Sequence, residues 1–156
     1  MSILKNAYSK IRKAWLVRLK AEYPQGISKG FESMSFRYIA DAYAWLAYFT
    51  NKRFKEIIDN EVIETPAIVI TELIRAMKKK RFTEKEIDLA LSFVVGRGFI
   101  LPLDFDSAKR GAKTAEQENL PLADGIIYSY VIDDNCRLLT GDEHFKNKKN
   151  IIFEKE

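Results

Sequence analysis

Four carboxylates of this 156-residue chain stand in apolar surroundings, where an unpaired charge is costly. They are Asp41 in YIADAYAWLAYF, Glu72 in IVITELI, Asp124 in PLADGIIY and Asp142 in LLTGDEHF. Carboxylates that gather in one place repel one another and raise each other's pKa, and a bound divalent cation removes that penalty. Because these ligands offer oxygen and neither Cys nor His, we expect Mg²⁺ or Mn²⁺ rather than zinc.

Such a cluster suits the attack of water on a phosphoryl group. Mg²⁺ retains water molecules, so carboxylates can hold the ion and still leave positions for a phosphate and an attacking water. Thr140 and Gly141 would place a hydroxyl and an open backbone next to the phosphate. We therefore predict a metal site formed by the four carboxylates, with Thr140 as a further catalytic residue.

Each acid taken alone also has a structural explanation. Asp124 can stabilise a helix dipole, Asp142 can cap the last helix, and Glu72 can be a solvated helix residue. Asp41 is the hardest to explain in this way because its flanks are apolar and aromatic. The placement of all four at strand ends and helix starts favours the cluster. His144, the only histidine, allows a metal or catalytic role, although a lone histidine more often packs or faces solvent.

Strands and helices that alternate from Tyr38 onward would position these residues. We predict strands at 37–40, 62–65, 99–104, 137–140 and 151–154, and helices over 42–50, 53–61, 67–80, 84–95, 107–119 and 121–135. Pro66 suits the first turn of its helix, and Thr83 with Glu86 forms a capping box. This alternation indicates a parallel sheet covered on both faces, with sites beyond the carboxyl ends of its strands.

The N-terminal segment differs from the rest of the chain in charge and pattern. Residues 1–37 hold eight Lys or Arg against two acids, about +6, and the remainder holds 18 against 20, about −2, which together give the net charge of +4. Residues 3–23 have the pattern of a basic amphipathic helix, and a linker with Pro, Gly and Ser follows. We place a boundary near Met34, with 1–33 as a helical extension or a start-site artefact and 34–156 as the main domain.

Composition also bounds the cellular setting. No apolar run approaches membrane-spanning length, and no secretory signal is recognisable. The single cysteine, Cys136, excludes an internal disulfide and a Cys-based zinc site. These features predict a cytoplasmic protein with no membrane partner. Walker, GxGxxG, GxSxG and HExxH motifs are absent, which disfavours the enzyme classes that depend on them.

The motifs YIADAYAWLAYF, VITEL, PLADGIIYSYV and RLLTGDEHF, in this order, resemble PIN-domain ribonucleases, in particular the VapC-type toxins of prokaryotic toxin–antitoxin pairs. The resemblance covers about residues 34–154, and residues 1–33 have no counterpart in it. It implies a PIN-like α/β fold with a parallel sheet of four to five strands between helices, and an Mg²⁺- or Mn²⁺-dependent endoribonuclease. It also implies an RNA substrate, a cognate antitoxin and a homodimer. It assigns the metal and catalytic roles to Asp41, Glu72, Asp124 and Asp142, with the hydroxyl on Thr140.

Other functions stay open at this point. An RNA-processing or structure-specific DNA nuclease would use the same chemistry, although the larger processing enzymes carry a zinc ribbon or another appended domain. A catalytically idle PIN-like module would bind RNA or a protein, but the retention of all four acids argues against it. A phosphoaspartyl phosphatase is disfavoured because Ala-Tyr-Ala follows Asp41, with no second acid two residues on.

Overall fold

The computed structural model describes residues 36–131 and 135–155. The helix and linker predicted for the N-terminal segment, and the boundary near Met34, lie outside these described residues. In the described part of the chain, no helix is both long enough and apolar enough to span a membrane.

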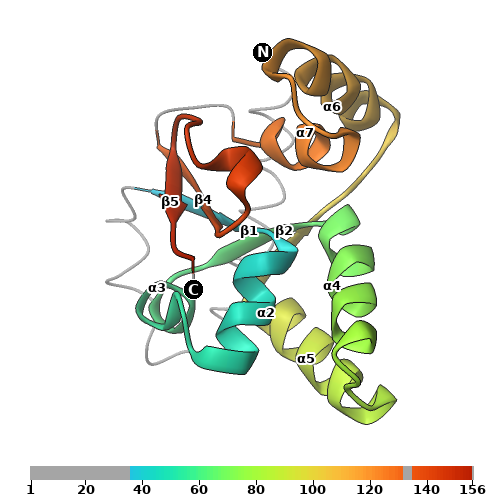
Figure 1. Cartoon of the computed structure of the whole chain (residues 1–156), viewed down its shortest axis with the longest axis vertical. Helices are drawn as coiled ribbons and strands as arrows, with labels where there is room; N and C mark the ends of the chain where they lie inside the picture. Colours follow the sequence, from blue (N-terminus) through green and yellow to red (C-terminus); the bar gives the residue numbers. More distant parts are fainter. Residues whose placement is uncertain (1–35, 132–134, 156) are drawn as a thin grey trace, which may run out of the picture. The chain divides into compact units, whose positions relative to one another are not determined.

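A parallel sheet forms the centre of the described domain (Figure 1). Its five strands follow the order β3-β2-β1-β4-β5, and every neighbouring pair is parallel. The bounds of the strands are β1 Arg37–Ala40, β2 Ile63–Pro66, β3 Gly98–Leu101, β4 Cys136–Thr140 and β5 Ile151–Phe153. The predicted parallel α/β architecture is therefore confirmed, and β1 and β4 lie side by side with their carboxyl ends at one rim.

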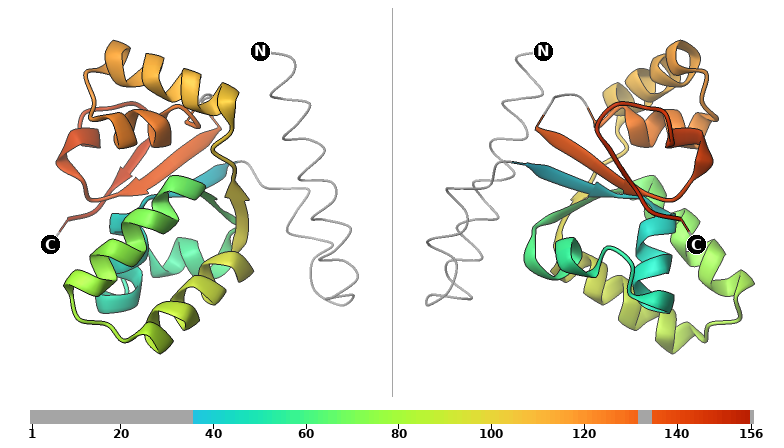
Figure 2. Two further views of the ribbon diagram at one scale, coloured as in Figure 1. Left: turned by 90° about the vertical axis from the view of Figure 1, so that its right-hand side faces the viewer. Right: turned by 60° about the vertical axis from the view of Figure 1, so that its left-hand side comes forward.

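Helices cover the two faces of the sheet, as Figures 1 and 2 show. The helices α2, α4 and α5 lie on one face, and α6 and α7 lie on the other. This division follows from right-handed crossovers, because the chain moves outward from β1 to β3 and then returns across the sheet to β4. The bounds are α2 Ala42–Asn51, α3 Lys55–Asn60, α4 Ala67–Lys79, α5 Glu84–Gly96, α6 Phe105–Glu118 and α7 Leu122–Tyr128, with a 3₁₀ turn η1 at Glu143–Phe145.

A buried core fixes α2 and α4 against the sheet. Trp45 of α2 is fully buried, and its indole N–H donates to Thr65 Oγ1 of β2 at 3.1 Å. Val69, Leu73 and Met77 form a buried stripe on α4 at the i, i+4, i+8 spacing of one helix face. Full burial of each such side chain stabilises the fold by about 2 kcal/mol. The stripe fixes the rotation of α4 about its own axis and therefore the direction of its remaining side chains.

Two predicted boundaries at strand ends are wrong. Pro66 is the last residue of β2, with the extended angles φ −57° and ψ 139°, and α4 begins only after it. The strand predicted to reach Asp104 ends at Leu101, because Asp104 accepts the backbone N–H of Ser107 at 2.9 Å and caps α6. The prediction of a capping box at Thr83 and Glu86 is confirmed.

The helix predicted over 121–135 is also too long. It ends at Tyr128, because the chain then closes in tight turns: Tyr130 N–H donates to Ile127 O at 3.2 Å and Val131 N–H to Tyr128 O at 2.9 Å. The Tyr130 hydroxyl donates to Pro102 O at 2.5 Å and holds this turn against the loop after β3. The short α7 leaves Asp124 in its first turn, close to the rim of the sheet.

Candidate functional site

Asp41 lies at the junction between β1 and α2. Its side chain is buried, with a residue exposure of only 4%. One carboxylate oxygen, Oδ1, accepts the backbone N–H of Ala44 at 2.8 Å and so caps α2. The other oxygen, Oδ2, accepts the hydroxyl of Thr140 from the end of β4. The first predicted acid is therefore held by two elements that are far apart in the sequence.

Thr140 links Asp41 to the next acid. Its side chain is fully buried, and its hydroxyl donates to Asp41 Oδ2 while accepting the backbone N–H of Asp142 at 3.0 Å. The single hydroxyl therefore uses its proton for one acid and a lone pair for the other. This arrangement fixes the loop that carries Asp142 beside Asp41.

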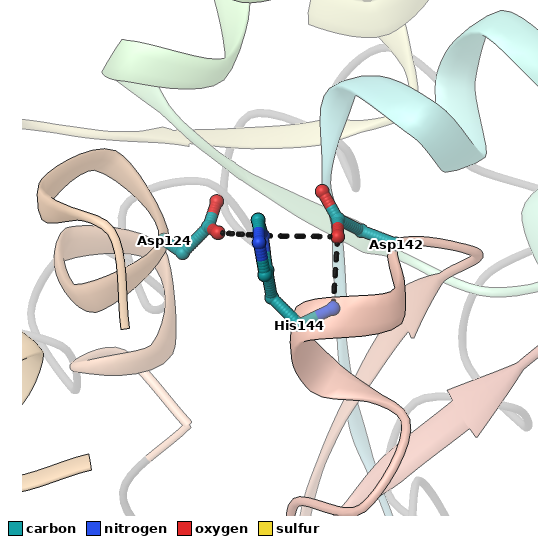
Figure 3. A group of neighbouring side chains, drawn as sticks. All are labelled: Asp124, Asp142 and His144. Atoms are coloured by element: carbon teal, nitrogen blue, oxygen red, sulfur yellow. Dashed lines mark hydrogen bonds and ion pairs between the residues drawn. The ribbon is translucent and has the colours of Figure 1, made fainter. Parts of the chain in front are cut away.

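Asp142, His144 and Asp124 form the second part of the site (Figure 3). Asp142 Oδ1 accepts the backbone N–H of His144 at 2.9 Å and caps η1. The imidazole Nδ1 lies 2.8 Å from Asp124 Oδ2 and 3.2 Å from Asp142 Oδ1, so the ring stands between the two carboxylates. One ligand atom from each of the three residues lies within 4.8 Å of the others.

Glu72 approaches from α4. It lies in the second turn of the helix and is half-buried. It is adjacent to Leu73 and lies beside the buried stripe. Among the described residues, its carboxylate has neither a hydrogen bond nor an ion pair. Its charge nevertheless acts on the site, because it contributes to the raised pKa of Asp41.

Three of the four carboxylates, Asp41, Glu72 and Asp124, have pKa values raised by burial and by the charge of Asp142. Burial raises the pKa of Asp41 to about 7, and the charges of Asp142 and Glu72 add to this rise against the hydrogen bonds from Thr140 and Ala44. Burial also raises the pKa of Glu72, and nearby Asp124 and Asp142 raise it further. The pKa of Asp124 is raised by burial and by Asp142, with His144 acting in the opposite direction.

This donor set fits a hard divalent cation. Within residues 36–131 and 135–155, no Lys or Arg pairs with any of the four carboxylates, and His144 is the one basic side chain in contact with them. A positive ion would stabilise the charged form of these carboxylates, whose pKa values are raised by burial and by mutual repulsion. Carboxylate oxygens are the ligands that Mg²⁺ and Mn²⁺ prefer. The chemistry of these side chains therefore fits a divalent cation of this kind.

Two sequence-based interpretations need correction. His144 does face solvent, with a side-chain exposure of 55%, but its ring also contacts two of the acids, which the expectation of a packed or solvated residue missed. Its spacing of two residues from Asp142 is a sequence signal for the contact with that acid, but not for the contact with Asp124. Gly141 does not provide an open backbone: it is buried, and a Cβ there would lie 2.1 Å from the Tyr43 ring and 2.4 Å from Glu154 O.

Comparison with known proteins agrees with this geometry. The profile of the PIN domain family matches residues 38–151, which contain all four acids. A search of curated proteins gives no match. Solved structures with the same fold include a toxin–antitoxin complex from Klebsiella pneumoniae, with a TM-score of 0.57, 20% identity, and coverage of 73% of this chain and 94% of that chain.

Two further structures are similar to this chain. One is VapBC2 from Rickettsia felis bound to a DNA fragment from its promoter, with a TM-score of 0.55, 21% identity, and coverage of 76% of this chain and 98% of that chain. The other is a protein from Pyrobaculum aerophilum, with a TM-score of 0.57, 21% identity, and coverage of 78% and 91%. These likenesses concern the fold alone. The family match spans most of the chain, and the chain therefore belongs to the PIN domain family.

Proposed function

We propose that this chain is an Mg²⁺- or Mn²⁺-dependent endoribonuclease that hydrolyses RNA phosphodiester bonds, and that it is the toxin of a VapBC-type toxin–antitoxin pair. PIN domains are nucleases, and the chain belongs to this family. The observation that carries the proposal is the link from Asp41 through Thr140 to Asp142, beside Asp124. It gathers acids from separate elements at one rim, with no Lys or Arg from the described residues to neutralise them.

Each side chain has a role in this proposal. Asp41, Asp142 and Asp124 would hold the cation, and Glu72 would ligate it or orient the attacking water. A cation bound there would supply polarisation of the phosphoryl group and a lower pKa of water. Thr140 keeps two of the acids at a fixed separation. Glu72, with a raised pKa and no partner among the described residues, is suited to accept a proton from water.

The partners follow from the same proposal. One solved structure with this fold is described as a toxin–antitoxin complex and another as VapBC2 bound to a DNA fragment from its promoter, which supports a cognate antitoxin as the protein partner. Large exposed apolar side chains, Leu89, Val95 and Phe105 among them, offer surface for an antitoxin or a second copy in a homodimer. The catalytic domain is residues 34–156, with 1–33 as a basic extension, and the protein acts in the cytoplasm.

The test compares RNA and DNA as substrates of the full-length protein. Fluorescently labelled single strands of both kinds are incubated with Mg²⁺, with Mn²⁺, or with EDTA, and the products are separated by size. The proposal predicts internal cleavage of RNA with either metal, none in EDTA, and much slower cleavage of DNA. Equal cleavage of both strands would favour a DNA or general processing nuclease. No cleavage of either strand with metal present would favour an idle binding module.

A further inference from the structure

Among the described residues, positive charges without a partner are concentrated on the C-terminal half of α4 and the turn that follows it. In the described part of the chain, most Lys and Arg side chains contact an acid, a backbone carbonyl or an aromatic ring. The cations without such a contact among these residues are Arg75, Lys79, Lys80, Arg81, Lys85, Lys113 and Lys149. The majority belong to α4 and the turn that follows it.

Two of these cations, Arg75 and Lys79, lie on the same side of α4 as Glu72. Arg75 is three residues and Lys79 seven residues beyond Glu72, which places both on the same side of the helix. The rise of a helix puts them about 4.5 and about 10.5 Å along the axis from Glu72. Both are exposed, whereas the buried stripe of Val69 and Leu73 faces the sheet. In Figure 1, α4 begins at the rim beside α7 and runs away from it.

We propose that Arg75 and Lys79, with Lys80 and Arg81 beyond them, bind the phosphate backbone of the RNA on one side of the scissile bond. We name these residues the α4 cationic strip. This inference rests on the proposed function. The site itself is acidic and repels a polyanion, so cations that are not already paired must attract it.

The stability of α4 offers another reason for some of these charges. Lys78 and Lys79 lie in the last turn, where cations stabilise the helix dipole. Lys78 also pairs with Glu84 at 3.0 Å. The dipole does not account for Arg75, which lies in the middle of the helix, and Arg75 forms no ion pair with Glu72 or any other described acid. Binding of RNA phosphates along this side of α4 would explain both Arg75 and Lys79.

The test uses two double variants with the same change in net charge. Arg75→Gln with Lys79→Gln alters the strip, and Lys113→Gln with Lys149→Gln removes two unpaired cations elsewhere. Affinity of each full-length protein for a labelled single-stranded RNA is measured by fluorescence anisotropy in EDTA, which prevents cleavage, over a series of NaCl concentrations. The strip variant should bind about tenfold more weakly at low salt, and its negative slope of log affinity against log salt should become shallower by about 1.4. The control should match the wild type.

Two results of the binding experiment would overturn the proposal. The first is a strip variant with the same affinity and slope as the wild type; if its melting temperature is also lower, the cations stabilise the helix dipole instead. Equal losses in strip and control variants would show a general effect of charge. Hydrolysis of bis-p-nitrophenyl phosphate with Mn²⁺ tests the metal site separately, because this small substrate cannot reach the strip. If the wild-type protein hydrolyses neither this ester nor RNA, both the proposed nuclease function and the proposed role of the strip are wrong.

Discussion

The Thr140 hydroxyl joins Asp41 and Asp142 by donating to the carboxylate of the first and accepting the backbone N–H of the second. These two acids are about a hundred residues apart in the sequence, and the parallel pairing of β1 with β4 brings them together. A fully buried hydroxyl with both of these bonds is a specific element of the site. It makes the position of Asp142 depend on that of Asp41.

Replacement of Thr140 tests this dependence. Thr140→Val leaves a buried carboxylate oxygen and a backbone N–H without their partner, so we expect a loss of about 2 kcal/mol in the free energy of unfolding. Thr140→Ser keeps the hydroxyl and should lose about 1 kcal/mol from the missing methyl group. Urea denaturation in EDTA measures both. Equal losses in the two variants would show that the hydroxyl does not hold the acids together.

The pH dependence of stability follows from Asp41. Its folded pKa of about 7 lies above the unfolded value of about 3.8, so the folded state binds a proton that the unfolded state releases. The contribution of Asp41 is therefore most favourable below pH 4 and is lost as the pH rises to 7, at no more than about 1.4 kcal/mol per pH unit. In EDTA, the stability of wild type relative to Asp41→Asn should fall across this window.

Added Mg²⁺ should reverse this loss near neutral pH, because the cation favours the charged carboxylate. Urea denaturation at several pH values, with Mg²⁺ and with EDTA, measures both effects. A wild type that gains stability relative to Asp41→Asn between pH 4 and 7 in EDTA would show that hydrogen bonds, rather than burial and repulsion, control the pKa of Asp41.

The sequence was sufficient to predict the architecture. Alternating periodicity predicts the parallel sheet. Asp41 and Asp142, each at the end of a strand, indicate that the site lies at the rim formed by the carboxyl ends of the strands. The contact of His144 with Asp124 was not predictable, because it depends on how η1 turns toward α7. The packing of Tyr43 over Gly141 was not predictable either, since a glycine before an acid has the same sequence signature in an open loop.

His144 should stabilise the metal-free site more than the metal-bound one. Its Nδ1 contacts both Asp124 and Asp142, so His144→Ala removes the group that separates their charges. The ring is half exposed, and we expect a loss of at most about 1 kcal/mol in EDTA. Saturating Mg²⁺ should remove most of the difference between variant and wild type. Thermal unfolding with Mg²⁺ and in EDTA measures the difference in stability between the variant and the wild type. A larger loss of stability with Mg²⁺ than in EDTA would instead indicate that His144 is a metal ligand.

Gly141 should tolerate no side chain. A Cβ there would meet the Tyr43 ring and the backbone of Glu154, so Gly141→Ala should cost about 2 kcal/mol or more and displace Asp142. Gly96→Ala is the matched control, because nothing lies within 4 Å of a Cβ at that position near the end of α5. Chemical denaturation and RNA cleavage are compared for both. If Gly141→Ala equals Gly96→Ala in both measurements, the packing of Tyr43 does not hold the loop.

The most direct measurement is the rate of RNA cleavage by Asp41→Asn and Asp142→Asn with saturating Mg²⁺. Asp88→Asn, an exposed acid of α5, is the control. Metal positioning and charge stabilisation supply much of the rate enhancement in such sites, so each site variant should be slower than wild type by about 100-fold or more while Asp88→Asn matches it. Cleavage by Asp41→Asn at the wild-type rate would contradict the assignment of these carboxylates as the metal site.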